Sequence, residues 1–196
     1  PQPCEVVARL RALGCPCIMG NHDLEVIDPE LVHEDASVSP WEIELINWCV
    51  AQLSEADVSF IRSFEPWIEI PLDDEASLMC FHGSPGSPLD KILATTSVAE
   101  LDKMLGGVAA TLMVGGHTHM QMLRQHKGVM IVNVGSVGSP LEQMPFEGVP
   151  RCLPWAEYAI VNWTNGILGV ELRRVPIDLE AVKQAALASD MPGAAF

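Results

Sequence analysis

The sequence predicts a mixed α/β fold with helices outside and sheets inside. Three observations support this fold class. Helical and strand-like segments alternate along the first two thirds of the 196 residues, and a hairpin signal, Asn165-Gly166, comes late. Hydrophobic residues make up 48% and charged residues 19% of the chain, which is enough apolar content for a core. The length favours a single domain over residues 1–196.

Helices are predicted where apolar residues recur at helical spacing beside a capping signal. Gly14 ends the first of them, and Ser54 with Asp57 three residues later forms a capping box for the third. Asp178 caps the last. Residues 21–40 are rich in Asp, Pro, Ser and His and predict a loop with at most one helical turn. The predicted helices cover residues 6–13, 41–50, 54–63, 98–105 and 178–188.

Strands are predicted where short apolar runs lie between turn signals. An acidic turn over residues 72–75 separates the second strand from the third, and the Asn-Gly turn joins the last two. Residues 139–155 read as a long loop rather than a domain boundary. The predicted strands cover residues 15–19, 67–70, 77–81, 110–114, 129–134, 158–163 and 167–173.

Composition excludes several classes of function. Eleven basic and 26 acidic residues give a net charge of −15, so generic binding to nucleic acid or to anionic membranes is disfavoured. If the protein handles anions, local cations such as bound metal ions must attract them. The sequence has neither a membrane-spanning apolar run nor a signal-peptide pattern, and its six cysteines are too sparse for a disulfide scaffold. We therefore expect reduced thiols and a cytoplasmic location.

Three histidine-containing clusters each follow a predicted apolar strand, where α/β folds place their sites. In the first, Asn21 offers a neutral oxygen to a metal, and Asp23 beside His22 can fix its tautomer. An ordinary Asn-His-Asp turn explains this cluster equally well. His82, followed by Gly83, forms the second, and taken alone it reads as a polar residue at a strand end.

The third cluster, Gly115-Gly116-His117-Thr118-His119, indicates a metal site more strongly. In an extended segment, residues two apart point to the same side, so His117 and His119 are expected to converge. Two convergent imidazoles suit Zn, Mn, Fe or similar ions, and the alternative is a pair of surface histidines. Residues 133–138 form a glycine-rich segment whose amides either cradle an anion or make a flexible turn.

Together the clusters resemble the calcineurin-like metallophosphoesterase superfamily. The matching segments are GNHD (20–23), HG (82–83), GHTH (116–119) and NVGSVG (133–138), in the order of the family, and the likeness runs to about Arg174. The subgroup looks like the small bacterial YfcE-like or diadenosine-tetraphosphatase-like phosphoesterases. The resemblance implies a four-layer α-β-β-α sandwich and a two-metal site at the strand ends, where a metal-bound hydroxide attacks phosphorus in line.

The resemblance also implies the ligands. Asn21, His82 and His117 would hold one metal ion and His119 the other. The ions would be divalent Mn, Fe, Zn or Co, with Mn the preferred expectation. The implied activity is hydrolysis of phosphoester or phosphoanhydride bonds, of the phosphodiesterase or nucleotide pyrophosphohydrolase type.

The same matching assigns the reacting and binding residues. His22, oriented by Asp23, would contact the phosphate or protonate the leaving oxygen. Gly135 and Ser136 would bind the phosphate, and Arg151 could pair with it in a bidentate manner. The expected partner is a small phosphorylated substrate, with no membrane or stable nucleic-acid binding, and self-association remains open.

The sequence departs from the family pattern in one respect. The Asp-x-His and Gly-Asp-x-x-Asp segments that precede GNHD in the family do not occur in it. We therefore expect an N-terminally truncated member that lacks the opening strand of the fold, binds one ion in place of two and catalyses poorly or not at all. The alternative hypothesis is a non-catalytic binding or regulatory module that retains a partial metal site.

Overall fold

The computed structural model describes residues 1–34, 38–142 and 151–193. The chain forms two compact units, the first built from Pro1–Glu65 and Asp178–Phe196 and the second from Pro66–Ile177. The mixed α/β class predicted from the sequence is confirmed. The single-domain organisation expected for residues 1–196 stays a prediction. Among the described residues, no helix combines the length and the apolar character that crossing a membrane requires.

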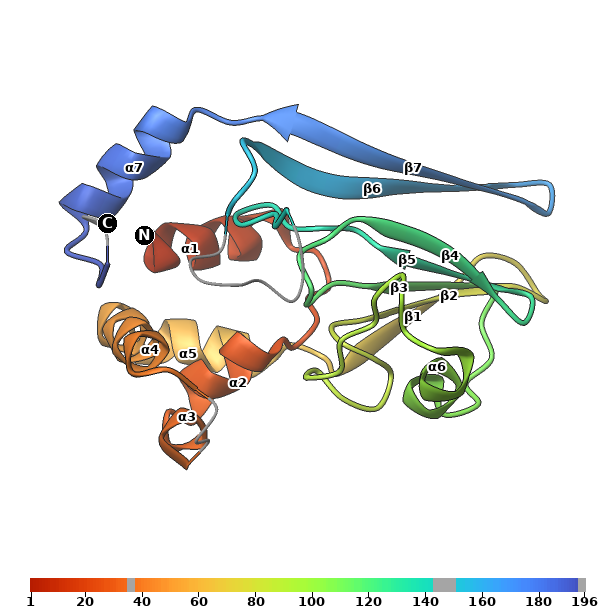
Figure 1. The fold of residues 1–196 in the computed structure, drawn as a ribbon, viewed down its shortest axis with the longest axis horizontal. Coiled ribbons are helices and arrows are strands. Elements are labelled where there is room, and N and C mark those ends of the chain that lie inside the picture. Colours follow the sequence, from red (N-terminus) through yellow and green to blue (C-terminus); the bar gives the residue numbers. More distant parts are fainter. Residues whose placement is uncertain (35–37, 143–150, 194–196) are drawn as a thin grey trace. The chain divides into compact units, whose positions relative to one another are not determined.

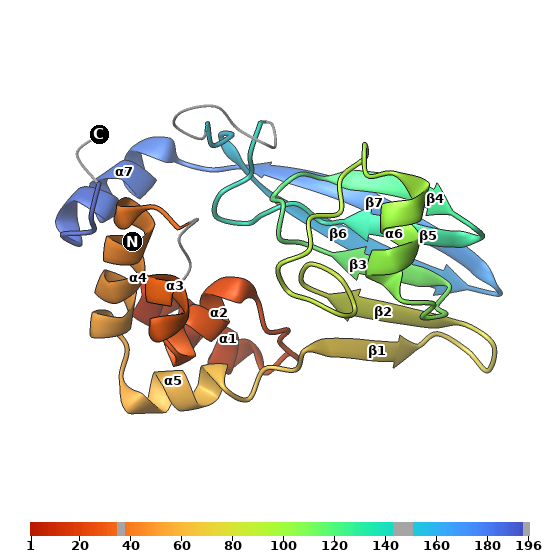
Figure 2. The same ribbon diagram turned by 60° about the horizontal axis from the view of Figure 1, so that its bottom comes forward.

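The first unit is helical (Figures 1 and 2). Its helices are α1 (Pro3–Leu13), α2 (Asn21–Ile27), α3 (Glu30–Glu34), α4 (Pro40–Gln52), α5 (Glu55–Ile61) and α7 (Leu179–Ala188). The predicted capping box is confirmed, since the Ser54 hydroxyl accepts from the Asp57 amide and the Asp57 carboxylate from the Ser54 amide. Asp178 caps α7 as predicted.

Two predictions for this unit were wrong. Residues 15–19 do not form a strand, and Ile18 makes only an isolated parallel bridge with Glu65. Residues 21–40 contain two helices in place of a loop, α2 and α3. The first begins because the Asp23 carboxylate accepts the Gly20 amide hydrogen, which satisfies a donor that the helix itself leaves unpaired.

The described residues of the second unit, 66–142 and 151–177, form a five-stranded sheet, a two-stranded ribbon and one helix. The sheet is ordered β1-β2-β3-β5-β4, with β2, β3 and β5 parallel and both outer strands antiparallel to their neighbours. The strands are β1 (Trp67–Pro71), β2 (Ser77–Phe81), β3 (Leu112–Gly115), β4 (Met122–His126) and β5 (Val129–Asn133). The sequence did not predict β4, which lies at the edge of this sheet.

Each face of this sheet is covered, as Figure 1 shows. Helix α6 (Val98–Leu105) packs on one face, where the buried residues are Met79, Phe81, Ile92, Leu101, Leu105, Met113 and Ile131. The ribbon of β6 (Trp155–Thr164) and β7 (Ile167–Pro176) packs on the other, around Leu78, Leu112 and Val132. The unit is thus a helix-sheet-sheet stack, and the full four-layer arrangement and the absent N-terminal strand stay predictions.

Hydrogen bonds to Asp102 link α6 to the β4–β5 turn. The His126 ring lies in the core, and its Nε2 is 2.9 Å from the Asp102 carboxylate of α6. The Lys127 ammonium donates to the other carboxylate oxygen at 2.7 Å. His126 lies in a polar stretch of the sequence, yet its ring is folded inward and is buried.

Candidate metal centre

The parallel pairing of β2 and β3 brings two histidine motifs to one edge of the sheet. Leu78 lies beside Leu112 and Cys80 beside Val114, so the residues after both strands emerge together. The His82 carbonyl accepts the Gly116 amide hydrogen at 2.8 Å, which extends the ladder past the strand ends. The local sequence thus determines where the two strands form, and their register determines that the residues after β2 and β3 lie side by side.

The imidazoles of His82 and His117 lie against each other. His117 Nδ1 is 3.2 Å from His82 Nε2, and the ring centroids are 5.1 Å apart. Gly115 makes room beside them, since a Cβ atom there would come within 2.9 Å of the Phe81 ring. The family resemblance assigns His82 and His117 to one metal ion, and their rings lie together at this edge.

The backbone that presents His117 is strained. His117 has φ 63° and His119 has φ 58°, in the left-handed region that side chains other than glycine seldom adopt. The Thr118 amide donates to the Gly116 carbonyl at 2.7 Å, which closes a tight turn around His117. The extended conformation expected for residues 117–119 was wrong, because this turn replaces strand geometry directly after β3.

His119 is held by the chain after β5. Its Nδ1–H donates to the Ser139 carbonyl at 2.8 Å, so the lone pair of the ring is on Nε2. A backbone carbonyl on the second nitrogen is the usual support of a metal-ligating histidine. The contact thus suits the ligand role that the family resemblance implies for His119.

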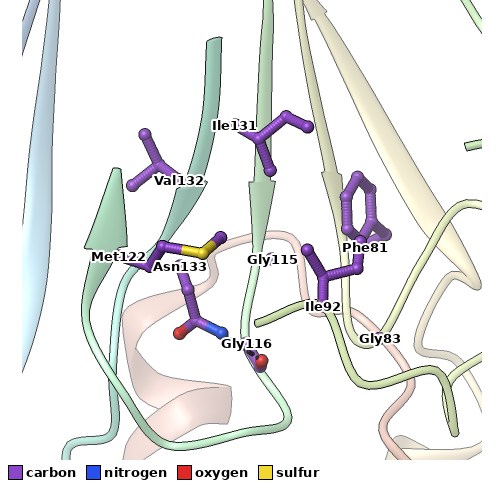
Figure 3. A pocket seen from close by; sticks show the side chains of 9 residues that line it. All are labelled: Phe81, Gly83, Ile92, Gly115, Gly116, Met122, Ile131, Val132 and Asn133. Carbon is purple, nitrogen blue, oxygen red and sulfur yellow. Dashed lines mark hydrogen bonds between the residues drawn. The ribbon is translucent and has the colours of Figure 1, made fainter. Parts of the chain in front are cut away.

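Asn133 connects the two loops; it was included in the NVGSVG segment of the sequence match but was given no role of its own. It is 3% exposed at the end of β5; its amide nitrogen donates to the Gly116 carbonyl and to the Thr118 hydroxyl, and its oxygen accepts the Gly135 amide hydrogen. Figure 3 shows the amide directed at Gly116. The available signal was a polar residue ending an apolar strand run, Val129 to Val132.

The cavity drawn in Figure 3 lies beneath this loop and not at the histidine pair. It is lined mainly by apolar groups, among them Phe81, Ile92 and Ile131, and its volume is about 10 Å³. This is the room that a single water molecule needs. It is therefore a packing gap under the site and not a substrate pocket.

The predicted phosphate-binding residues Gly135 and Ser136 lie in the next turn. Gly135 has φ 82°, and a Cβ atom there would overlap the carboxylate of Glu157, a side chain that is 2% exposed. The Ser136 hydroxyl accepts the Ser139 amide hydrogen at 3.0 Å. Ser136 thereby shapes the carbonyl that holds His119, and phosphate binding by this turn stays a prediction.

Residues 83–97, which follow His82, are held in place by side-chain hydrogen bonds. The Ser84 hydroxyl donates to the Asp90 carboxylate at 2.6 Å and accepts the Gly86 and Ser87 amide hydrogens. The guanidinium of Arg124 on β4 donates to the carbonyls of Leu93, Ala94 and Thr96. The chain beside the histidine pair is therefore fixed at both ends.

The first motif lies in the other unit, on the opening turn of α2. His22 is 71% exposed, and its Nδ1 is hydrogen-bonded to the Glu25 carboxylate, which raises the pKa of His22. The other Glu25 oxygen accepts the Asn21 amide at 3.3 Å. The expected orienting residue, Asp23, instead caps the helix at Gly20, and burial raises the pKa of its carboxyl. Residues three apart share a helix face and adjacent residues do not, so Glu25 reaches His22 where Asp23 cannot.

Arg151 lies on the surface. Its side chain is 78% exposed and pairs with Glu142 at 3.3 Å. An exposed pair of this kind is weak, so Arg151 could exchange its carboxylate partner for a phosphate. Its proposed role in substrate binding stays a prediction.

The donor set was compared with what a metal ion requires. Over residues 1–34, 38–142 and 151–193, no group of three or more His, Cys, Asp and Glu side chains is gathered to hold a metal ion. The His82–His117 pair nevertheless fits two ligands of one ion, because the two ring nitrogens lie 3.2 Å apart, close enough for both to contact the same ion. The residues fit a divalent ion in chemistry and spacing, with two imidazoles of a larger ligand set.

The fold and the site together define a mixed α/β protein with imidazoles at the ends of parallel strands. The model of the calcineurin-like phosphoesterase superfamily domain matches residues 2–149. The chain therefore belongs to this superfamily. A comparison with curated proteins found no match.

Two solved structures share the fold. The hypothetical protein PH1004 of Pyrococcus horikoshii OT3 is 16% identical with a TM-score of 0.79, over 98% of this chain and 77% of its own. A metallophosphoesterase of Sphaerobacter thermophilus is 20% identical with a TM-score of 0.70, over 97% of this chain and 78% of its own. At these identities the likeness shows the architecture.

Proposed function

We propose that this protein is a metal-dependent phosphoesterase that cleaves phosphodiester bonds or the phosphoanhydride bonds of nucleotides. The observation that carries the proposal is the His82–His117 pair, with ring nitrogens 3.2 Å apart at the ends of two parallel strands. Membership of the calcineurin-like phosphoesterase superfamily supports the same chemistry. The substrate would be a small phosphorylated molecule.

Members of this superfamily bind divalent metal ions. His82 and His117 would hold one ion, His119 would hold a second, and Asn21 is a further ligand by resemblance to the family motif. Mn²⁺ is the first ion to test, ahead of Fe, Zn and Co. When bound, such ions polarise a phosphoryl group and activate water for attack on it.

The side chains of the chain itself would orient the substrate and move protons. His22, exposed and bonded to Glu25, would contact the phosphate or donate a proton to the leaving oxygen. The amides at Gly135 and Ser136 and the guanidinium of Arg151 would bind phosphate oxygens. Because the chain carries a net charge of −15, these local donors and bound cations must overcome its repulsion of anions.

The direct test is hydrolysis of a chromogenic phosphodiester and of a dinucleoside polyphosphate with Mn²⁺ added. We expect weak turnover in the parent, since the Asp-x-His and Gly-Asp-x-x-Asp segments do not occur in the sequence, loss of that turnover in H117A and H119A, and no loss in H33A, a histidine outside all motifs. Without metal, the melting temperatures of all variants should stay close to that of the parent, because His117 and His119 would serve as ligands and not as structural residues. Turnover that is unchanged in H117A and H119A contradicts the proposed site.

One observation favours a second candidate function, a non-catalytic binding module with a partial metal site. The described residues gather no set of three or more His, Cys, Asp and Glu ligands. Calorimetric titration with Mn²⁺ separates the two functions. Binding that depends on His82 and His117, without turnover of any phosphoester tested, would support the module over the enzyme.

A further inference from the structure

The turn that carries His117 is costly to form. His117 has a positive φ of 63°, and the Thr118 amide donates to the carbonyl two residues back, at Gly116. This is a γ-turn of the positive-φ type, which is rare and strained. His119 has a positive φ as well, 58°. Strain of this kind persists only where the surroundings impose it, and it gathers at functional sites.

The side chain of Asn133 makes the hydrogen bonds that hold this turn. Its amide nitrogen donates to the Gly116 carbonyl and, at 3.0 Å, to the Thr118 hydroxyl, so it holds the residues on both sides of His117. Its oxygen accepts the Gly135 amide hydrogen at 2.9 Å, which fixes the amide's orientation. Asn133 is 3% exposed and Thr118 is 1% exposed, so water competes little for the hydrogen bond between these two side chains.

We propose that Asn133 is a positioning residue that holds the strained turn in the one conformation that places His117 against His82. The register of β3 and β5, with Gly115 beside Asn133, delivers the amide to the turn. The imidazole pair is then arranged before any ion arrives, and no ordering of the loop is needed on binding. The consequence for metal affinity rests on the proposed function, whereas the consequence for ring geometry does not.

The first experiment compares N133D with N162D. The aspartate at 133 keeps the size and the acceptor for Gly135 but loses both donors to the turn. The same substitution at Asn162, exposed on β6, controls for the added charge. By calorimetry with Co²⁺ we expect a 10–100-fold loss of affinity in N133D and parent affinity in N162D. Affinity in N133D equal to or above that of the parent overturns the proposal.

A matched pair at Thr118 gives an answer even where N133D fails to fold. T118V removes the hydroxyl that accepts from Asn133 and keeps the volume, whereas T118S keeps the hydroxyl and loses a methyl group. If the turn is held through hydrogen bonds, T118V loses Co²⁺ affinity and T118S retains it. The reverse order would mean that packing of the methyl group holds the turn, and the proposal fails.

A metal-free measurement separates this proposal from the proposed function. The ring Cε1–H resonances of His82 and His117, assigned from H82N and H117N, are recorded at one pH without metal. We expect both to move in N133D and T118V but not in N162D or T118S. A parent that binds no metal overturns the proposed function alone, and unmoved resonances overturn the positioning role of Asn133.

Discussion

Two histidines of this protein use the same ring nitrogen to contact the fold. His22 meets Glu25, and His119 meets the Ser139 carbonyl, each through Nδ1. The difference lies in the partner: a carboxylate strengthens the basicity of His22 and raises its pKa, whereas a neutral carbonyl only orients His119.

This difference predicts separate phenotypes for His22 and the ligand histidines. H22A should lower the turnover number by about 100-fold or more, because it removes a group that would protonate the leaving oxygen, and it should leave metal content unchanged. Metal analysis of the purified variant beside its steady-state kinetics is the measurement. Parallel loss of metal and turnover would remove His22 from the proton-transfer role.

Gly135 predicts a stability effect inside the site. G135A places a Cβ atom on a residue with φ 82° and into the buried carboxylate of Glu157, so we expect a loss of about 2–4 kcal/mol in the free energy of unfolding. G138A, in the same segment and with no atom within 4 Å of the added Cβ, should change it by less than about 1 kcal/mol. Urea unfolding measures both, and equal effects in the two variants would contradict the geometry.

Sequence reasoning found the residues with distinctive chemistry and missed those that support them. The histidine motifs were visible because each follows an apolar strand run. The role of Asn133 was missed because strand register brings it to Gly116 and Thr118. The role of Glu25 was missed because helix phase brings it to His22. Neither register nor phase can be seen in a list of motifs. Asp23 was read as the partner of His22 for the same reason.

At the scale of elements, helix ends were the most predictable feature. Ser54 with Asp57 and Asp178 cap helices where expected, because capping is a contact between near neighbours in the sequence. Strand β4 was missed because its sequence, Met122 to His126, has two apolar residues followed by three polar ones and so lacks the alternation typical of a strand. The 15–19 run failed as a strand because apolar character alone does not provide a pairing partner.

The link between α6 and the β4–β5 turn predicts a pH-dependent contribution to stability. Hydrogen bonds from Lys127 and His126 lower the pKa of Asp102 from 3.8. A lowered carboxyl pKa favours folding above the ordinary value, and the contribution is lost as pH falls through the lowered value. D102N should therefore melt below the parent at pH 7, and the gap should narrow below about pH 3.8.

The control for this prediction is D74N, an aspartate exposed in the turn between β1 and β2. It should melt with the parent at every pH. Thermal unfolding followed by circular dichroism between pH 7 and pH 2.5 compares the three proteins. A gap between D102N and the parent that stays constant across this range would contradict a role for the Asp102 charge.

At the scale of the whole molecule, charge and metal binding are coupled. The chain carries −15 at neutral pH, so a divalent cation bound as proposed would reduce self-repulsion as well as join His82 to His117. A ligand that binds only the folded state stabilises it by mass action, by about 2.7 kcal/mol at one hundred times its Kd.

The fold class was predictable because the alternation of elements and the late hairpin are properties of the entire chain.

This coupling predicts a metal-dependent melting temperature. Mn²⁺ at about one hundred times its Kd should raise the Tm of the parent by roughly 5–10 °C. The H82A/H117A double variant should melt at one temperature with and without Mn²⁺, measured by differential scanning calorimetry after removal of metal by a chelator. An equal rise in both proteins would place the ion elsewhere.

Arg124 donates hydrogen bonds to the carbonyls of Leu93, Ala94 and Thr96. These bonds would limit the movement of the segment beside the histidine pair when a substrate binds. Residues 83–97 are hydrogen-bonded near both ends of the segment, so we expect this segment to stay in place and not to close over a bound substrate. Selectivity among substrates beside this segment would then follow from the fixed shape of residues 83–97. Exchanging the outward side chains of this segment, such as Leu89 and Lys91, would be the way to retune which molecules fit without disturbing the histidines.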